Sequence, residues 1–126
     1  MTIRPAMPAD SRAIFRLLDE NKMTLDGVRY GDFSPLCLVA ERQGQVVGAL
    51  QVLMGKPYAS LMFLAVAKEH QAKGYGTKLF DACELVLRSY DIPAVSMGTE
   101  QAEVVDMLTR RGAVTIKIGM ALVKVL

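Results

Sequence analysis

The sequence contains no tryptophan, two cysteines and one histidine among its 126 residues. Cys37 and Cys83 lie far apart in apolar surroundings, which fits neither the spacing of a zinc site nor a disulfide framework. We therefore expect two reduced, buried thiols and no metal site. The single histidine, His70, has no catalytic partner evident in the sequence, so we expect it to be exposed and to take no part in catalysis.

Long apolar runs and a strong charge of one sign are also missing. No stretch approaches the roughly 18 apolar residues that span a membrane, and residues 1–5 lack the charged start and apolar run of a signal peptide. Lys and Arg total 15 against 13 Asp and Glu, for a net charge of +2, and they are scattered along the chain. This pattern does not favour nucleic-acid binding. We expect a cytoplasmic protein that binds neither membrane nor nucleic acid.

The composition favours one compact domain. Hydrophobic residues make up 52% of the chain, and the mean hydropathy is +0.26. A chain of this length buries roughly two-thirds of its unfolded surface, which is enough for a real core. We therefore predict a single domain over residues 1–126.

Periodicity predicts alternating helices and strands. Helices are expected from Pro8, where Ile14, Leu17 and Leu18 repeat at helical spacing, from about Gly74 to Tyr90, and between residues 99 and 112. Residues 58–66 are nearly all apolar, so this strand is predicted to be central and buried on both faces. Other strands are predicted at residues 2–5, 36–40, 46–54, 94–97, 113–118 and 120–126. This order indicates an α/β domain with a mixed sheet.

The most informative segment is residues 71–77, Gln-Ala-Lys-Gly-Tyr-Gly-Thr, which we call the glycine segment. It lies where the apolar strand ends and the helix begins, so its backbone N–H groups could converge on an anion. Its spacing differs from the P-loop, because Thr77-Lys78 follows Gly76 in the wrong order. It differs from the dinucleotide fingerprint, because Leu79 stands where the third glycine belongs. A Gly-x-Gly pair is also compatible with an ordinary tight turn.

Residues 64–80 resemble the acetyl-CoA motif of the GNAT superfamily of N-acetyltransferases. That motif has an apolar strand ending in Leu-x-Val, a short loop, an Arg or Gln, two spacers, Gly-x-Gly and an apolar helix, all present here in register. Residues 2–10 and 38–48 resemble the family's opening strand and helix and its second and third strands. The resemblance implies a GNAT-like acetyl-CoA-binding domain over residues 1–126, with a mixed, mostly antiparallel central sheet flanked by helices.

The resemblance also implies roles for individual residues, with acetyl-CoA as the acetyl donor. Leu64 and Val66 would offer backbone groups to the pantetheine arm in the manner of an added strand, and a backbone N–H near Val66 would meet the thioester carbonyl. Thr77 would stand at the start of the helix. The pyrophosphate would be bound by the N–H groups of Gln71, Ala72, Lys73, Gly74, Tyr75 and Gly76.

The chain departs from the family pattern at the acid and the base. Residues 57–67 contain no Asp or Glu, so Glu69 on the loop and Glu41 on a neighbouring strand are the candidate bases. Leu108 stands where the family often has a tyrosine acid. Two hypotheses follow: an N-acetyltransferase, or a non-catalytic GNAT-like module that binds CoA or a protein partner.

The acceptor is expected to be an amine of a small molecule or a protein. Residues 19–35, with Asp26, Tyr30 and Asp32, would form part of its wall, and acidic groups suit a cationic amine. The apolar C-terminal strands could pair across a homodimer, an arrangement common in the family.

Overall fold

The computed structural model describes residues 1–23, 36–55, 57–98, 114–116 and 121–125. In chain order, the described elements are β1 (Thr2–Pro5), the short 3-10 helix η1 (Pro8–Asp10), α1 (Ser11–Glu20), β2 (Leu36–Arg42), β3 (Gln45–Leu53), β4 (Ala59–Val66), the 3-10 helix η2 (Lys68–His70), α2 (Tyr75–Ser89), β5 (Ala94–Gly98), β6 (Val114–Ile116) and β7 (Ala121–Val125). The predicted helix between residues 99 and 112 lies outside the described residues.

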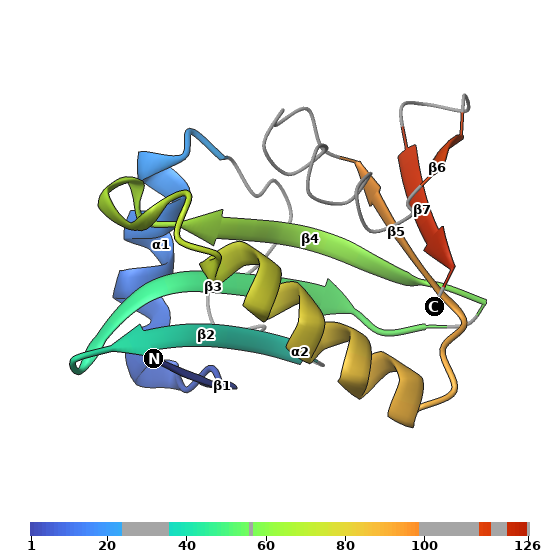
Figure 1. Ribbon diagram of the computed structural model, residues 1–126, viewed down its shortest axis with the longest axis horizontal. Helices are drawn as coiled ribbons and strands as arrows, with labels where there is room; N and C mark the ends of the chain where they lie inside the picture. The colour runs from blue at the N-terminus through green and yellow to red at the C-terminus, as the bar shows by residue number, and fades with distance from the viewer. Residues whose placement is uncertain (24–35, 56, 99–113, 117–120, 126) are drawn as a thin grey trace.

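The described strands form one sheet in the order β1-β2-β3-β4-β5-β7-β6 (Figure 1). Every neighbouring pair is antiparallel except β4 and β5, which run parallel. The α/β class and the mixed, mostly antiparallel sheet predicted from the sequence are therefore confirmed. The apolar strand β4 is central, as expected, and β1 ends at Pro5 on one edge. At the opposite edge the outer strand is β6, because β7 lies between β5 and β6.

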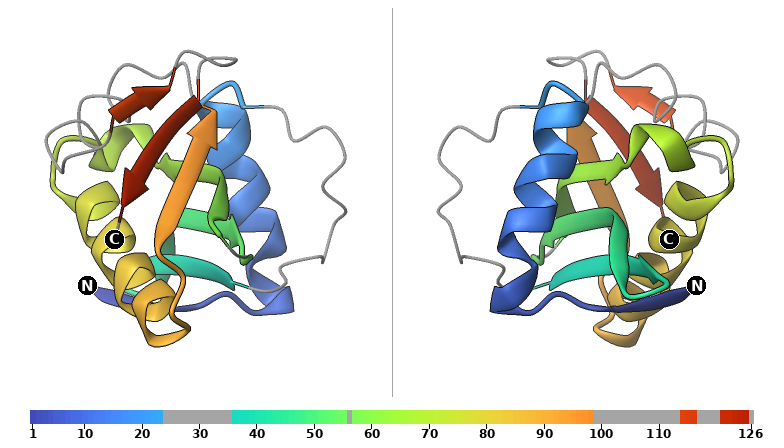
Figure 2. Two further views of the ribbon diagram at one scale, coloured as in Figure 1. Left: turned by 90° about the vertical axis from the view of Figure 1, so that its right-hand side faces the viewer. Right: turned by 90° about the vertical axis from the view of Figure 1, so that its left-hand side faces the viewer.

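The two α-helices of the described residues, α1 and α2, cover opposite faces of the sheet, as Figure 2 shows. Ile14, Leu17 and Leu18 of α1 are buried on one face against sheet residues that include Val39, Ala49 and Phe63. On the other face, α2 buries side chains four or so apart along its length against Leu50 and Val52; these are Tyr75, Leu79, Phe80, Cys83 and Leu87. Alternate residues of a strand point to opposite faces, so the apolar strands supply both cores at once.

A bulge in β4 lies where the pairing of β4 with β5 ends. The register of β4 against β3 shifts between Phe63, which pairs with Gln51, and Leu61, which pairs with Val52, so Met62 is the extra residue. Pairing between β4 and β5 is confined to Ala59–Leu61 on the β4 side. Beyond it the two strands diverge in Figure 1. Within the described residues, the second half of β4 has a strand neighbour on its β3 side alone.

In the part of the chain that the structure describes, no helix combines the length and the apolar character needed to cross a bilayer.

Candidate functional site

The start of α2 leaves backbone donors available. Gly74, the N-cap, has a left-handed backbone with φ 84° and no side chain that could cap the helix. The first helical bond runs from Lys78 N–H to Gly74 C=O at 3.1 Å. The amides of Tyr75, Gly76 and Thr77 precede it, and no partner for them is recorded among the described residues. Together with the helix dipole, these donors suit an anion.

The glycine segment lies against the end of β4. A Cβ built on Gly76 would lie 3.8 Å from Val66 Cγ2 and 4.0 Å from Leu64 Cδ2. The segment also contains Ala72 with φ 62°, a backbone conformation uncommon for a residue with a side chain. The structure therefore brings together Leu64, Val66 and residues 71–77, the set that the sequence predicts for the cofactor.

The backbone of β4 presents polar groups on its open side. Ala67 N–H donates to Val47 C=O of β3 at 2.8 Å. Because successive residues of a strand direct their backbone groups to alternate sides, those of Val66 and Leu64 face away from β3. On that side, β5 has already diverged. The N–H groups of Leu64 and Val66 thus form an unpaired strand edge beside the glycine segment, within the residues described.

One group on this edge is already bonded. The C=O of Val66 accepts hydrogen bonds from Gln71 Nε2 and from Asn21 Nδ2, both at 3.1 Å. Sequence reasoning did not identify Asn21, which lies 45 residues from Val66 and carries no signal of its own in the sequence. The Gln71 backbone N–H makes a long contact of 3.4 Å with Lys68 C=O. The side chain of Gln71 therefore points into the protein.

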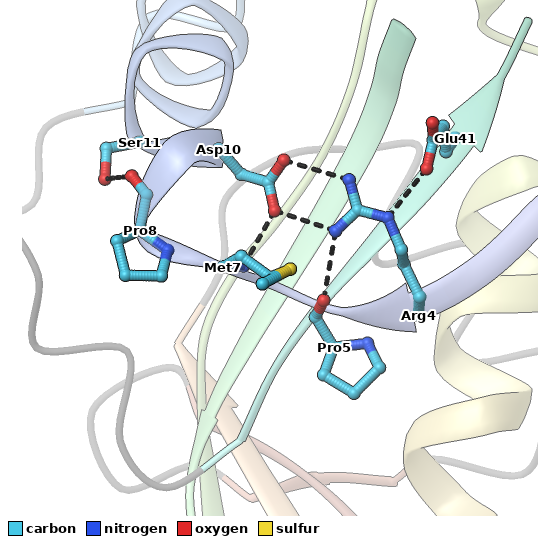
Figure 3. A network of polar contacts seen from close by, with 7 residues as sticks. All are labelled: Arg4, Pro5, Met7, Pro8, Asp10, Ser11 and Glu41. Carbon is cyan, nitrogen blue, oxygen red and sulfur yellow. Dashed lines mark hydrogen bonds and ion pairs between the residues drawn. The ribbon is translucent and has the colours of Figure 1, made fainter. Parts of the chain in front are cut away.

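Glu41, a predicted base, lies in an ion-pair cluster two strands away from β4 (Figure 3). Its Oε2 accepts from Arg4 Nε at 2.7 Å, while the Arg4 Nη atoms reach Asp10 at 2.8 and 3.0 Å. Asp10 also accepts Met7 N–H at 2.7 Å. The hydrogen bonds from Arg4 lower the pKa of the Asp10 carboxyl and raise that of the guanidinium. This arrangement favours a structural role for Glu41.

Glu69, the other predicted base, lies on η2 with a side chain that is 82% exposed, 3.7 Å from His70 Nε2. The expectation that His70 is exposed was wrong, because its side chain is only 19% exposed. The ring packs edge-on against Tyr75, with centroids 5.9 Å apart. Tyr75 is itself buried, and its hydroxyl lies 3.4 Å from Arg42 Nη1. Tyr75 can thus contribute a backbone N–H to an anion while its side chain belongs to the core.

Cys37 and Cys83 are buried and free, as predicted. Burial raises the pKa of each thiol to about 12, so neither is a nucleophile near neutral pH. Among the described residues, no group of three His, Cys, Asp or Glu side chains could hold a metal ion. The remaining sequence-predicted positions (Asp26, Tyr30, Asp32 and Leu108) lie outside the described residues.

Comparisons with known proteins identify the family of the chain. The model of the acetyltransferase (GNAT) family matches residues 6–112. A search of curated protein sequences gave no significant match.

Solved structures share the fold across the full chain. A GNAT acetyltransferase from Staphylococcus aureus Mu50 has a TM-score of 0.86 at 14% identity, covering 99% of this chain and 98% of its own. A ribosomal-protein-alanine N-acetyltransferase from Brucella melitensis has a TM-score of 0.80 at 21% identity, covering 100% of both chains. The PaiA N-acetyltransferase from Thermoplasma acidophilum, solved with coenzyme A, has a TM-score of 0.81 at 15% identity, covering 99% and 98%. On the family match, with its fold in agreement, the chain belongs to the acetyltransferase (GNAT) family of enzymes.

Proposed function

We propose that the protein is an acetyl-CoA-dependent N-acetyltransferase that acetylates an amine of a small molecule or a protein. The observation that carries the proposal is the meeting of two sets of unpaired backbone donors at the end of β4. One set is the uncapped start of α2, and the other is the open edge at Leu64 and Val66. A diphosphate joined to an extended amide-bearing arm matches this pair of sites.

Different described residues would bind different parts of the cofactor. The amides of residues 72–77 suit the pyrophosphate, with Gly74 and Gly76 allowing close approach. Lys73 is exposed beside them and adds positive charge. The N–H groups of Leu64 and Val66 suit the pantetheine arm. The Thermoplasma acidophilum neighbour was solved with coenzyme A, which supports this ligand class.

The proposed reaction replaces the thioester bond with an amide bond. The amine nitrogen bonds to the thioester carbonyl carbon, the carbon–sulfur bond breaks, and the proton lost by the amine is matched by one gained by the thiolate. A backbone N–H on the β4 edge would stabilise the charge that develops on the carbonyl oxygen. The exposed Glu69 stays a candidate base, whereas the ion pair of Glu41 with Arg4 argues against Glu41.

A second candidate function is a non-catalytic module that binds CoA. It is favoured by the lack of any Asp or Glu from residue 57 to residue 67, which leaves β4 without a carboxylate. Both candidates require the same cofactor site and differ only in turnover.

Binding and turnover are tested separately. We expect calorimetry to detect acetyl-CoA binding, and thioester consumption to appear with at least one member of a panel of amines, peptides and proteins. Binding without turnover on any acceptor would favour the non-catalytic module. No binding would rule out both candidates.

A Gly76→Arg variant tests the assigned site. The added side chain would fill the space over Leu64 and Val66, so we expect acetyl-CoA affinity to fall by at least 100-fold, although the new charge alone would favour an anion. The matched control is Ser89→Arg, which places the same side chain on an exposed position at the other end of α2. Equal affinity of the two variants would show that the cofactor binds elsewhere.

A further inference from the structure

We infer that Asn21 is a positioning residue that holds the glycine segment in its anion-binding shape, through the side chain of Gln71. The inference rests on the proposed function for the identity of the ligand. Asn21 is the C-cap residue of α1 and belongs to none of the segments that the sequence predicts for the cofactor.

Four hydrogen bonds join three parts of the fold. Asn21 Nδ2 donates to Leu17 C=O at 2.7 Å within α1 and to Val66 C=O at 3.1 Å at the end of β4. Gln71 Nε2 donates to Asn21 Oδ1 at 3.0 Å and to the same Val66 C=O at 3.1 Å. Each side-chain amide therefore uses both of its N–H groups, and Asn21 also uses its oxygen.

The network fixes the position from which the glycine segment begins. Gln71 is its first residue, and its side chain is tied to α1 and β4 at the same time. From there the chain must enter the left-handed backbone at Ala72 and Gly74 before α2 starts. The bonds of this network are partly shielded from water, and connected amide bonds restrict conformation more than the sum of their separate bonds suggests. Loss of Asn21 should therefore loosen residues 71–77 even though Asn21 is outside that segment.

The network also determines which backbone group of Val66 is available to a ligand. With two donors on its carbonyl, Val66 keeps only its N–H available on the open edge. These two bonds thus leave a hydrogen-bond donor, the Val66 N–H, at the place where the family resemblance expects the thioester carbonyl.

A purely structural role for Asn21 makes a different prediction. As a helix C-cap alone, Asn21 would contribute to the stability of α1 through the bond to Leu17, and its loss would not alter residues 71–77. The matched control is Ser11→Ala, which removes a 2.7 Å side-chain bond to Pro8 C=O at the opposite end of α1.

The first test needs no ligand. Amide hydrogen exchange is measured at His70, Gln71 and Lys78, whose N–H groups are hydrogen-bonded at the two ends of the glycine segment, in the wild type, Asn21→Ala, Gln71→Ala, the double variant and Ser11→Ala. We expect exchange to rise about tenfold in both single variants, with little further rise in the double variant, and to stay at the wild-type rate in Ser11→Ala. Unchanged exchange in Asn21→Ala would overturn the inference.

The second test uses acetyl-CoA itself. We expect the dissociation constant to rise roughly tenfold in Asn21→Ala, the scale of one or two net hydrogen bonds, and to be unchanged in Ser11→Ala. Asn21→Asp keeps an acceptor for Gln71 but loses both donors, so its dissociation constant should lie between those of the wild type and Asn21→Ala. If affinity falls equally in Ser11→Ala, the effect is one of stability and the inference fails. If the wild type binds no acetyl-CoA, the proposed function fails, and the exchange experiment still decides the role of Asn21.

Discussion

Single residues in this protein divide between those that shape the site and those that hold the fold. Gly76 illustrates the first kind, since a methyl group there would meet only ordinary contacts at 3.8 and 4.0 Å. Its lack of a side chain is therefore better explained by a ligand than by packing. Asp10 illustrates the second kind, because its side chain is only 10% exposed and each of its oxygens bonds to Arg4. Both lie near the start of a helix, yet Gly76 would affect ligand binding whereas Asp10 affects the stability of the fold.

Asp10 should make stability depend on pH. The folded-state pKa of Asp10 is lowered, chiefly by its hydrogen bonds from Arg4. Its stabilising effect is therefore present above the ordinary pKa near 3.8 and is lost as the pH falls through the lower folded value. We expect Asp10→Asn to reduce the free energy of unfolding by about 1–3 kcal/mol at pH 7, and the difference from the wild type to close below about pH 4. Urea unfolding at pH 7, 5 and 3 measures it.

The Arg4–Glu41 bond supplies a comparison within the same cluster. The Glu41 side chain is 30% exposed, so Glu41→Gln should cost only about 0–1 kcal/mol at pH 7. A gap between Asp10→Asn and the wild type that stayed constant from pH 7 to pH 3 would contradict the assigned pKa shift.

At the scale of elements, the site depends on how α2 packs on the sheet. Leu79 of α2 approaches β3 at Gly48, where a Cβ would lie 3.1 Å from Leu79 Cδ1 and 3.4 Å from Ala65 C=O. The glycine lets the helix lie close to the sheet, and this closeness places the start of α2 over Leu64 and Val66. The bulge at Met62 lies beside the same site, at the point where β4 stops pairing with β5 and its edge becomes open.

A methyl group at Gly48 should therefore destabilise the packing of α2. We expect Gly48→Ala to lower the free energy of unfolding by about 1–3 kcal/mol, the usual effect of overfilling a packed interior. Gly76→Ala is the matched control: it adds the same group within a helix but meets no close atom, so stability should be unchanged or slightly higher. Chemical denaturation of both variants checks the pair. Equal losses of unfolding free energy in the two variants would show that the close approach of Leu79 to Gly48 is not what makes Gly48→Ala destabilising.

At the scale of the whole molecule, the described residues form one sheet with an α-helix on each face, and both cysteines are buried. Cys37 contacts the α1 side and Cys83 the α2 side, so each thiol reports on a different half of the core. Neither thiol is exposed to accept an acetyl group, so in the proposed reaction the amine would attack the thioester directly.

Thiol reactivity tests this arrangement. Burial raises the pKa of both thiols to about 12, so neither should react with an aromatic disulfide reagent in the native protein at pH 8. In denaturant we expect two thiols per chain to react rapidly. Rapid reaction of either thiol under native conditions would mean that its face of the sheet opens, and would make that cysteine a candidate nucleophile.

The sequence by itself determined the order of the described elements and singled out the glycine segment as the predicted cofactor site. Both are local properties: apolar periodicity marks the helices and strands, and Gly74 and Gly76 at a strand–helix junction mark exposed amides. The predicted strand at residues 58–66 and helix at 74–90 correspond to β4 and α2 within a residue or so. The family resemblance rested on the same local features.

Only the tertiary structure decided which distant residues meet. Arg4 and Glu41 are 37 positions apart, and Asn21 and Gln71 are 50 apart, so no local pattern could pair them. We expected His70 to be exposed because its local sequence does not indicate that its ring packs against Tyr75, on the first turn of the next helix. The bulge at Met62 arises from the register between two strands, which is set by the packing of both faces at once. Local sequence thus specified the glycine segment, while long-range packing fixed its shape and the strand edge beside it.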